Sequence, residues 1–206
     1  MKRNVLSRVI FAALAVGIPV SCGYQEPPSE EESAPAELTG TSEQAATIQD
    51  QDWWRSLSQM ERNQAILDRS ARDINMYVGL NCKQWVQRVV ADASRGVVWV
   101  PTTYPDAYGW TWNSSKYAVR VYMDIRTVQP GWIVQMNRWG RNGGITPHTA
   151  IVVGRSTDGI YWIESNYAPK FDDNTVRLRS ETFADFERAT FINGTYRYSM
   201  YYVRGG

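Results

Sequence analysis

The chain has 206 residues and a formal net charge of +1, with 43% hydrophobic and 21% charged residues. This composition fits one globular domain with appendages and excludes a wholly disordered or collagen-like chain. The charge is unevenly spread: residues 23–52 hold eight acidic residues and no Lys or Arg, which leaves 19 basic against 13 acidic residues from residue 53 onwards. The pattern predicts an acidic tether ahead of a moderately basic domain. The overall balance gives no indication of nucleic-acid binding, and we expect none.

The first 22 residues are predicted to be a targeting segment. Three basic residues, Lys2, Arg3 and Arg8, precede an apolar stretch from Val9 to Val20. About a dozen residues suit a signal sequence, whereas a membrane span needs about 20. No later stretch approaches that length, so the sequence predicts export, with contact to a membrane only through a lipid anchor.

Cys22 lies between Ser21 and Gly23, in a pattern that resembles a bacterial lipoprotein signal. In such signals the chain is cut before the cysteine, which is then lipidated. Pro19 stands where the pattern usually has Leu, and cleavage after Gly23 by an ordinary signal peptidase is the alternative. In both cases residues 23–52, rich in Pro, Glu, Ser, Ala and Thr, are predicted to form a flexible linker.

The exported domain, predicted over residues 53–206, then has one thiol, Cys82, and one histidine, His148. Two cysteines in the whole chain are too few for a disulfide scaffold, and these residues cannot supply a usual zinc shell. We therefore expect no metal and no cofactor. Exported compartments oxidise thiols, so an unpaired cysteine there suggests a function, unless Cys82 is an inert buried side chain.

Two helices are predicted at the start of the domain. Ser58 and Glu61 form a capping box before a helix over residues 59–74. Gly79 separates this helix from the next one, and Asn81 is a good N-cap for a second helix over residues 82–94. The apolar residues of this second helix recur with helical periodicity, namely Trp85, Val86, Val89, Val90 and Ala93. Cys82 falls at its first position, on the apolar stripe.

The later part of the chain is predicted to be mostly strand. Residues 116–123 fit either a helix or a strand; the predicted strands are 132–136, 148–153, 160–164, 175–178 and 196–203, with a helical turn over 182–188. Asp158-Gly159 and Asn193-Gly194 mark turns. Helices followed by a mostly antiparallel sheet define an α+β fold.

One hairpin brings candidate catalytic residues together. If it closes near residues 156–157, His148 lies opposite residue 165, with Glu164 and Asn166 as neighbours. A carboxylate or an amide at one ring nitrogen fixes the imidazole tautomer, and either residue could serve. A thiol at a helix N-terminus favours the thiolate, so Cys82 is the candidate nucleophile if the fold brings it to His148.

These segments resemble the CHAP domains, the cysteine, histidine-dependent amidohydrolases/peptidases of the NlpC/papain-like superfamily. The resemblance covers about residues 76–170 and is carried by four segments in the family's order, Asn81-Cys82-Lys83-Gln84-Trp85-Val86, Pro130-Gly131-Trp132-Ile133-Val134, His148-Thr149-Ala150-Ile151-Val152 and Ile163-Glu164-Ser165-Asn166-Tyr167. Trp132 stands where the family often has Asp, and Pro147 replaces the Gly before the histidine.

The resemblance implies a papain-like α+β cysteine hydrolase. Cys82 would be the nucleophile, His148 the general base, Glu164 the residue that orients the imidazole, and Asn166 an assisting polar group. The implied substrate is an amide bond in peptidoglycan or another peptide, cleaved through a thioester. The alternatives are a cell-envelope binding or scaffold lipoprotein with the same fold but no catalysis, and a transglutaminase-like acyltransferase. The oligomeric state is open.

Overall fold

The computed structural model describes residues 46–99, 112, 116–139, 143–166 and 174–206, all within one compact unit, Thr41–Gly206. The predicted signal segment 1–22, its Cys22 and most of the predicted linker lie outside the described residues. Within the described part of the chain, none of the helices is long and apolar enough to cross a membrane.

The folded part begins earlier than the predicted boundary at residue 53. Helix α1 (Ile48–Ser56) includes the last five residues of the predicted linker. Thr47 and Asp50 form a capping box, and Trp54 is fully buried. This start was not predicted because the acidic composition here is the same as that of the linker. In the structure, Asp50 is a capping residue at the positive end of the helix.

Helices α2 (Gln59–Ala71) and α3 (Cys82–Ala93) confirm the two predicted helices, although α2 ends three residues early. Ser58 and Asn81 are their N-caps, each in a complete capping box. Asn81 accepts from the backbone of Gln84 at 2.9 Å, while Gln84 accepts from the backbone of Asn81 at 3.2 Å. An N-cap of this type contributes about 1 kcal/mol and fixes the residue at which α3 begins, which is Cys82.

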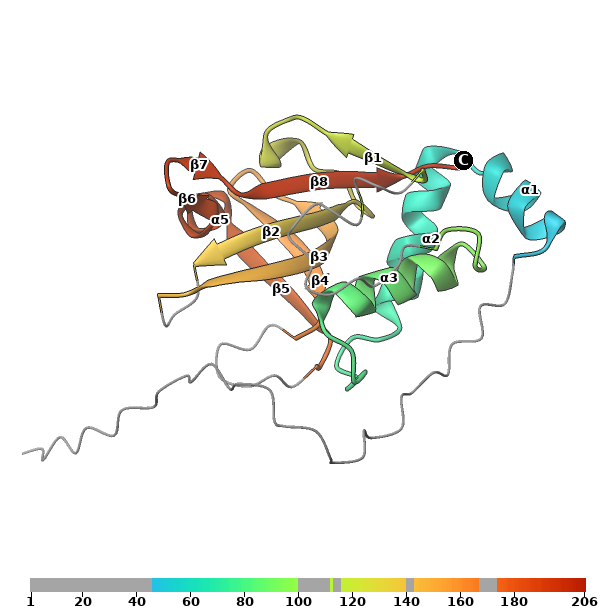
Figure 1. The fold of residues 1–206 in the computed structure, drawn as a ribbon, viewed down its shortest axis with the longest axis horizontal. Coiled ribbons are helices and arrows are strands. Elements are labelled where there is room, and N and C mark those ends of the chain that lie inside the picture. Colours follow the sequence, from blue (N-terminus) through green and yellow to red (C-terminus); the bar gives the residue numbers. More distant parts are fainter. Residues whose placement is uncertain (1–45, 100–111, 113–115, 140–142, 167–173) are drawn as a thin grey trace, which may run out of the picture. The chain divides into compact units, whose positions relative to one another are not determined.

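A six-stranded antiparallel sheet follows, in the order β1-β8-β2-β3-β4-β5. Its strands are β1 (Ala118–Val121), β2 (Ile133–Trp139), β3 (Ile145–Arg155), β4 (Gly159–Glu164), β5 (Arg177–Thr182) and β8 (Tyr198–Val203). A 3-10 helix, η1 (Ile125–Thr127), precedes β2, helix α5 (Phe183–Thr190) follows β5, and the short strands β6 (Phe191–Ile192) and β7 (Thr195–Tyr196) form a separate hairpin. The predicted α+β class is confirmed, with α1, α2 and α3 preceding the strands (Figure 1).

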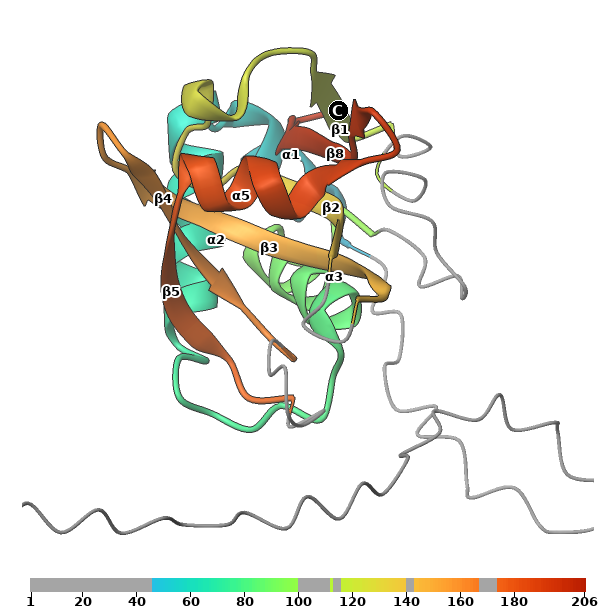
Figure 2. The same ribbon diagram turned by 90° about the vertical axis from the view of Figure 1, so that its left-hand side faces the viewer.

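The two faces of the sheet pack against different helices. One face buries Ile133, Ile151 and Ile163 against α2 and α3, including the predicted stripe of α3. The other face buries residues such as Trp162 against Phe186 of α5, with their rings 5.6 Å apart. Figure 2 shows α5 and α3 on either side of the sheet. Strand residues of odd and even number therefore enter different cores over β2 and over residues 150–152 of β3.

A β-bulge changes the register between β3 and β4. Near the turn, Gly154 pairs with Tyr161, whereas beyond the bulge Val152 pairs with Trp162 and Ile151 with Ile163. One extra residue on β3 is thus accommodated, which is the usual effect of a bulge. The predicted register would pair Ile151 with Trp162 and is therefore one residue off at Ile151; the ladder ends at that residue, before it reaches His148.

The bulge decides which side chains share the face of His148. In the observed register, positions 148, 150 and 164 lie on the same face, because opposite residues of antiparallel strands project to the same side. A ladder without the bulge would continue the pairing seen near the turn, and Glu164 would then project to the other face. The irregularity therefore brings Glu164 to His148.

Candidate active site

Cys82 is the first residue of α3 and the one free cysteine among the described residues. The amides of the first helical turn have no acceptor within the helix, and they carry the positive end of the helix dipole. Buried side chains from Trp85 to Ala93 pack the helix against the sheet. The Cys82 sulfur therefore lies at the edge of the core. Its predicted position at the helix start is confirmed.

His148 lies in β3 at the point where this strand leaves β4. The β3–β4 ladder ends at the pair Ile151–Ile163, whereas β3 continues to pair with β2 as far as Ile145. The N-terminus of α3 lies beside this part of β3: the Cys82 sulfur is hydrogen-bonded to the His148 side chain and to the backbone of Thr149. The structure therefore brings together the two residues on which the sequence prediction depended.

The surroundings of the pair favour the charged form of both partners. Burial raises the pKa of Cys82, but the His148 charge and hydrogen bond, with backbone bonds from Thr149 and Lys83, bring that pKa below its ordinary value. Burial lowers the pKa of His148, but Cys82 and then Glu164 raise it above its ordinary value. A thiolate and an imidazolium together are the state in which a cysteine acts as a nucleophile near neutral pH.

Glu164 occupies the third position. Its Oε2 lies 2.8 Å from Nε2 of His148, and its side chain is completely buried. This contact occupies Nε2 and leaves the other ring nitrogen, Nδ1, for the thiol. Of the two candidates that the sequence left open for the partner of the imidazole, the geometry favours Glu164.

Asn166 is held differently from Glu164. Its backbone is left-handed, with φ of 55°, two residues beyond the end of β4. Its Oδ1 is buried and has no hydrogen-bond partner in the described part of the structure. The structure thus places Asn166 next to the strand end that carries Glu164, but shows no contact between Asn166 and the imidazole.

Two contacts that the sequence analysis did not predict complete the site. Arg179 on β5 donates from Nη1 to Oε1 of Glu164 at 2.9 Å, so each carboxylate oxygen has its own partner. Ser165, also fully buried, donates from Oγ to the carbonyl of Leu80 at 2.8 Å. Leu80 is two residues before Cys82, so this bond ties the end of β4 to the start of α3.

The loop before α3 is also attached to the sheet. Asn75 and Val78 donate their backbone N–H groups to the carbonyls of Val176 and Asn174, at 2.8 and 3.0 Å. The Val176 N–H donates in turn to the carbonyl of Met76 at 3.0 Å. The segment before β5 therefore fixes the approach to Cys82. Sequence reasoning had no signal for this pairing beyond the apolar character of the two segments.

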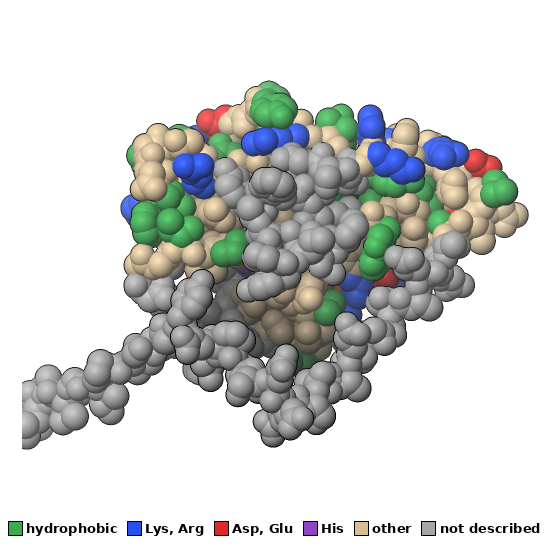
Figure 3. Space-filling view, in the orientation of Figure 1, with side chains coloured by type: hydrophobic (Ala, Val, Ile, Leu, Met, Phe, Trp, Pro, Cys, Tyr) green, Lys and Arg blue, Asp and Glu red, His purple; other side chains and the backbone are tan. Residues whose placement is uncertain are grey.

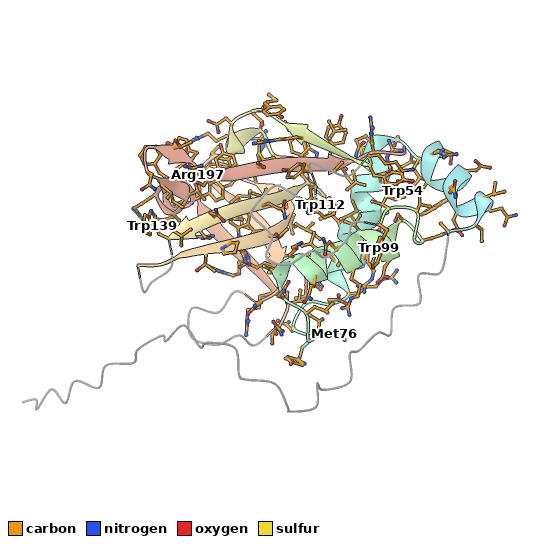
Figure 4. The ribbon with its side chains drawn as sticks, in the orientation of Figure 1. Trp54, Met76, Trp99, Trp112, Trp139 and Arg197 are labelled. Atoms are coloured by element: carbon orange, nitrogen blue, oxygen red, sulfur yellow. The ribbon has the colours of Figure 1, made fainter. Side chains whose placement is uncertain are left out.

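The sheet extends beyond the N-terminus of α3. Trp139 ends β2 opposite Ile145 at the start of β3, and both are nearly half exposed. Figure 4 shows Trp139 near Arg197 at the end of the sheet remote from Trp54. Trp139 donates from Nε1 to the carbonyl of Phe191 at 3.1 Å, which fixes its ring.

The described residues hold no group of three or more His, Cys, Asp or Glu side chains that could bind a metal. On the face seen in Figure 3, Lys and Arg side chains are interspersed with hydrophobic and acidic ones. Where described side chains are visible on this face, the basic ones do not form a single continuous patch.

Comparisons with known proteins add little to this geometry. No family model matches the chain, and no curated protein matches it. Among solved structures, the chain is similar to the crystal structure of Ly7917, at 16% sequence identity and a TM-score of 0.47. The match covers 70% of this chain and 63% of that one, so the chain spans less than two thirds of that structure. A likeness this distant carries no argument about function.

Proposed function

We propose that the chain is an exported, lipid-anchored cysteine hydrolase of the CHAP type, with a papain-like fold, that cleaves an amide bond in peptidoglycan peptides. The observation that carries the proposal is the hydrogen-bonded line from Cys82 through His148 to Glu164 at the start of α3. Nucleophile, base and orienting group are within hydrogen-bond reach in the order that acyl transfer needs. The substrate class and the export come from the motif resemblance and from residues 1–22.

In the first half of the reaction, the Cys82 thiolate attacks the amide carbon and a C–S bond forms. The backbone N–H of Cys82 is placed to donate to the oxyanion, since it belongs to the first turn of α3. His148 then gives its proton to the leaving nitrogen, the C–N bond breaks, and an amine departs. A thioester and a neutral imidazole remain.

In the second half, water attacks the thioester carbon while His148 takes a proton from it. The C–S bond breaks, the acid product leaves, and the thiolate–imidazolium pair is restored. Glu164 keeps its contact with the ring in both halves, so that it holds the tautomer and stabilises the imidazolium. No step requires a metal or an organic cofactor.

The proposal is tested by incubating the purified protein with sacculi from several types of cell wall and analysing the released muropeptides. We expect new amine and carboxyl ends in equal number from the wild type and none from Cys82→Ala. The control is Arg155→Gln, at an exposed position of β3 outside the site. Equal release, or none, from wild type and Cys82→Ala on all walls would contradict hydrolysis of peptidoglycan.

The same assay separates the alternatives that the sequence left open. Addition of a primary amine would divert the thioester to an amide product if the protein were a transglutaminase-like acyltransferase. A binding or scaffold protein would retain sacculi without releasing fragments, and its Cys82 would react slowly with a thiol probe near neutral pH.

A further inference from the structure

Arg179 contacts the candidate active site but has no part in the reaction steps proposed above. It lies on β5 opposite Trp162, so its side chain is on the same face as Glu164, one diagonal step along the ladder. Its Nη1 lies 2.9 Å from Oε1 of Glu164, while Oε2 of the same carboxylate contacts His148. Glu164 is completely buried, whereas Arg179 is 29% exposed.

We propose that Arg179 is a positioning residue for the proposed hydrolase: it provides the counter-charge of the buried Glu164 carboxylate and fixes its orientation, so that Glu164 in turn holds the His148 imidazole in line with the Cys82 sulfur. This inference rests on the proposed function for its biological meaning. It concerns the state of the thiol and the imidazole, however, and both can be measured without any substrate.

The first reason is the cost of an isolated buried carboxylate. A carboxylate removed from water protonates unless a counter-charge and hydrogen bonds compensate. During the proposed cycle His148 gives up its proton, and Glu164 then loses its imidazolium partner. Arg179 cannot lose its charge at any accessible pH, so it stabilises the Glu164 anion in both states of His148.

The second reason is orientation. A carboxylate with one occupied oxygen can rotate about its terminal bond, which is a soft torsion. With Oε1 bound to Arg179 and Oε2 bound to His148, the plane of Glu164 is fixed from both sides. The planar guanidinium provides this constraint better than an ammonium group would.

Several charged groups from different elements face the site. Among the described residues they are Cys82 and Lys83 on α3, His148 on β3, Glu164 on β4, and Arg177 and Arg179 on β5. Arg177 stands directly opposite Glu164 in the ladder, but the ion pair of Glu164 is made by Arg179. Cys82, His148, Glu164 and Arg179 form a line of alternating charge, and removing Arg179 leaves that line with an excess negative charge.

The test compares Arg179→Gln with Arg179→Lys and with Arg155→Gln, an exposed control on β3. The rate at which iodoacetamide alkylates Cys82 is followed from pH 4 to 10 by mass spectrometry of the Cys82 peptide. In Arg179→Gln we expect the acidic limb to move up by about one pH unit, so that alkylation is about tenfold slower at pH values on that limb. Arg179→Lys should recover most of this loss, and Arg155→Gln should match the wild type.

A double-mutant cycle with Glu164→Gln shows whether Arg179 acts through Glu164. In the Glu164→Gln background, the further change Arg179→Gln should leave the alkylation profile unmoved, because the group that Arg179 positions is gone. The Glu164→Gln protein and the double variant can still be compared if Arg179→Gln alone fails to fold. The double variant lacks both charges of the ion pair, so it leaves neither of them buried without a partner.

Two results would overturn the inference. One is an Arg179→Gln profile that superimposes on that of the wild type. The other is an equal shift from Arg179→Gln with and without Glu164. Neither depends on sacculus hydrolysis, so failure of the proposed function and failure of this inference remain distinguishable.

Discussion

Asp73 links the two helices that position Cys82, and its replacement by Asn gives a quantitative test of the fold. It follows α2, and its carboxylate accepts from Nε1 of the fully buried Trp85 on α3 at 2.8 Å. It also pairs with Arg69 at 2.9 Å and with Arg88 at 3.4 Å, and its own side chain is 9% exposed. The α2–α3 contact therefore has a buried charge at its centre.

The expected loss follows from these partners. Asn retains one acceptor oxygen for Trp85, but the charge that both arginines contact disappears. Breaking a buried ion pair costs about 3–5 kcal/mol. Here Arg69 keeps a second partner, Asp92, at 2.8 Å, and Arg88 is 35% exposed, so solvent screens its contribution. We expect Asp73→Asn to lower the free energy of unfolding by about 2 kcal/mol at pH 7.

The pH dependence has a definite sign. Burial raises the pKa of Asp73, but the hydrogen bonds from Trp85 and Arg69 bring that pKa below its ordinary value of 3.8. A carboxyl with a lowered pKa in the folded state stabilises the fold above its unfolded pKa, and this contribution is lost as pH falls through the folded pKa. The difference between wild type and Asp73→Asn should therefore be full at pH 6 to 7 and shrink below about pH 4.

Urea unfolding followed by tryptophan fluorescence measures this difference, with Asp68→Asn as the matched control. Asp68 is exposed on the same helix α2, and its replacement should change stability by no more than about 0.5 kcal/mol. An Asp73→Asn protein as stable as that control would refute the reasoning. So would a difference from the wild type that stays constant down to pH 3.

Two further predictions concern the end of β4. Ser165→Ala removes the 2.8 Å hydrogen bond to the Leu80 carbonyl and should lower the free energy of unfolding in urea by about 1 kcal/mol. The control Ser180→Ala, at an exposed position of β5, should leave that free energy unchanged, and equal effects of the two changes would contradict a role for the bond. Glu164→Gln removes the charge beside the imidazole and should lower the pKa of His148 by about 1–3 units. Because the chain has a single histidine, proton NMR titration of the ring reports this pKa directly, and an unchanged value would contradict the assigned contact.

Much of this architecture could be predicted from local patterns. The capping box before α2, the N-cap residue Asn81 before α3 and the helical stripe from Trp85 to Ala93 are short-range signals, and they place Cys82 at a helix start without any tertiary information. Strand positions followed from apolar runs between turn residues. The approximate neighbourhood of His148 and Glu164 followed from the hairpin between them.

The remaining features depend on contacts between distant segments. Arg179 belonged to a segment in which the predicted strand stopped at residue 178, so its contact with Glu164 was not expected. The hairpin closes one residue later than predicted, with Arg155 opposite Ile160, and the bulge then moves the register back by one residue. No periodicity could show this, although Gly154 within a strand pattern was a signal for the bulge. The early start of α1 was hidden because its acidic residues resembled the linker.

The pH dependence of Cys82 alkylation tests the central claim most directly. We expect rapid alkylation through neutral pH, well below the ordinary thiol pKa of about 8.5, with a sharp loss in His148→Gln. The Cys82 peptide is resolved from that of Cys22 by mass spectrometry. If wild type and His148→Gln gave the same slow rise in rate near pH 8.5 to 9, the thiolate–imidazolium pair would not exist and the hydrolase proposal would be contradicted.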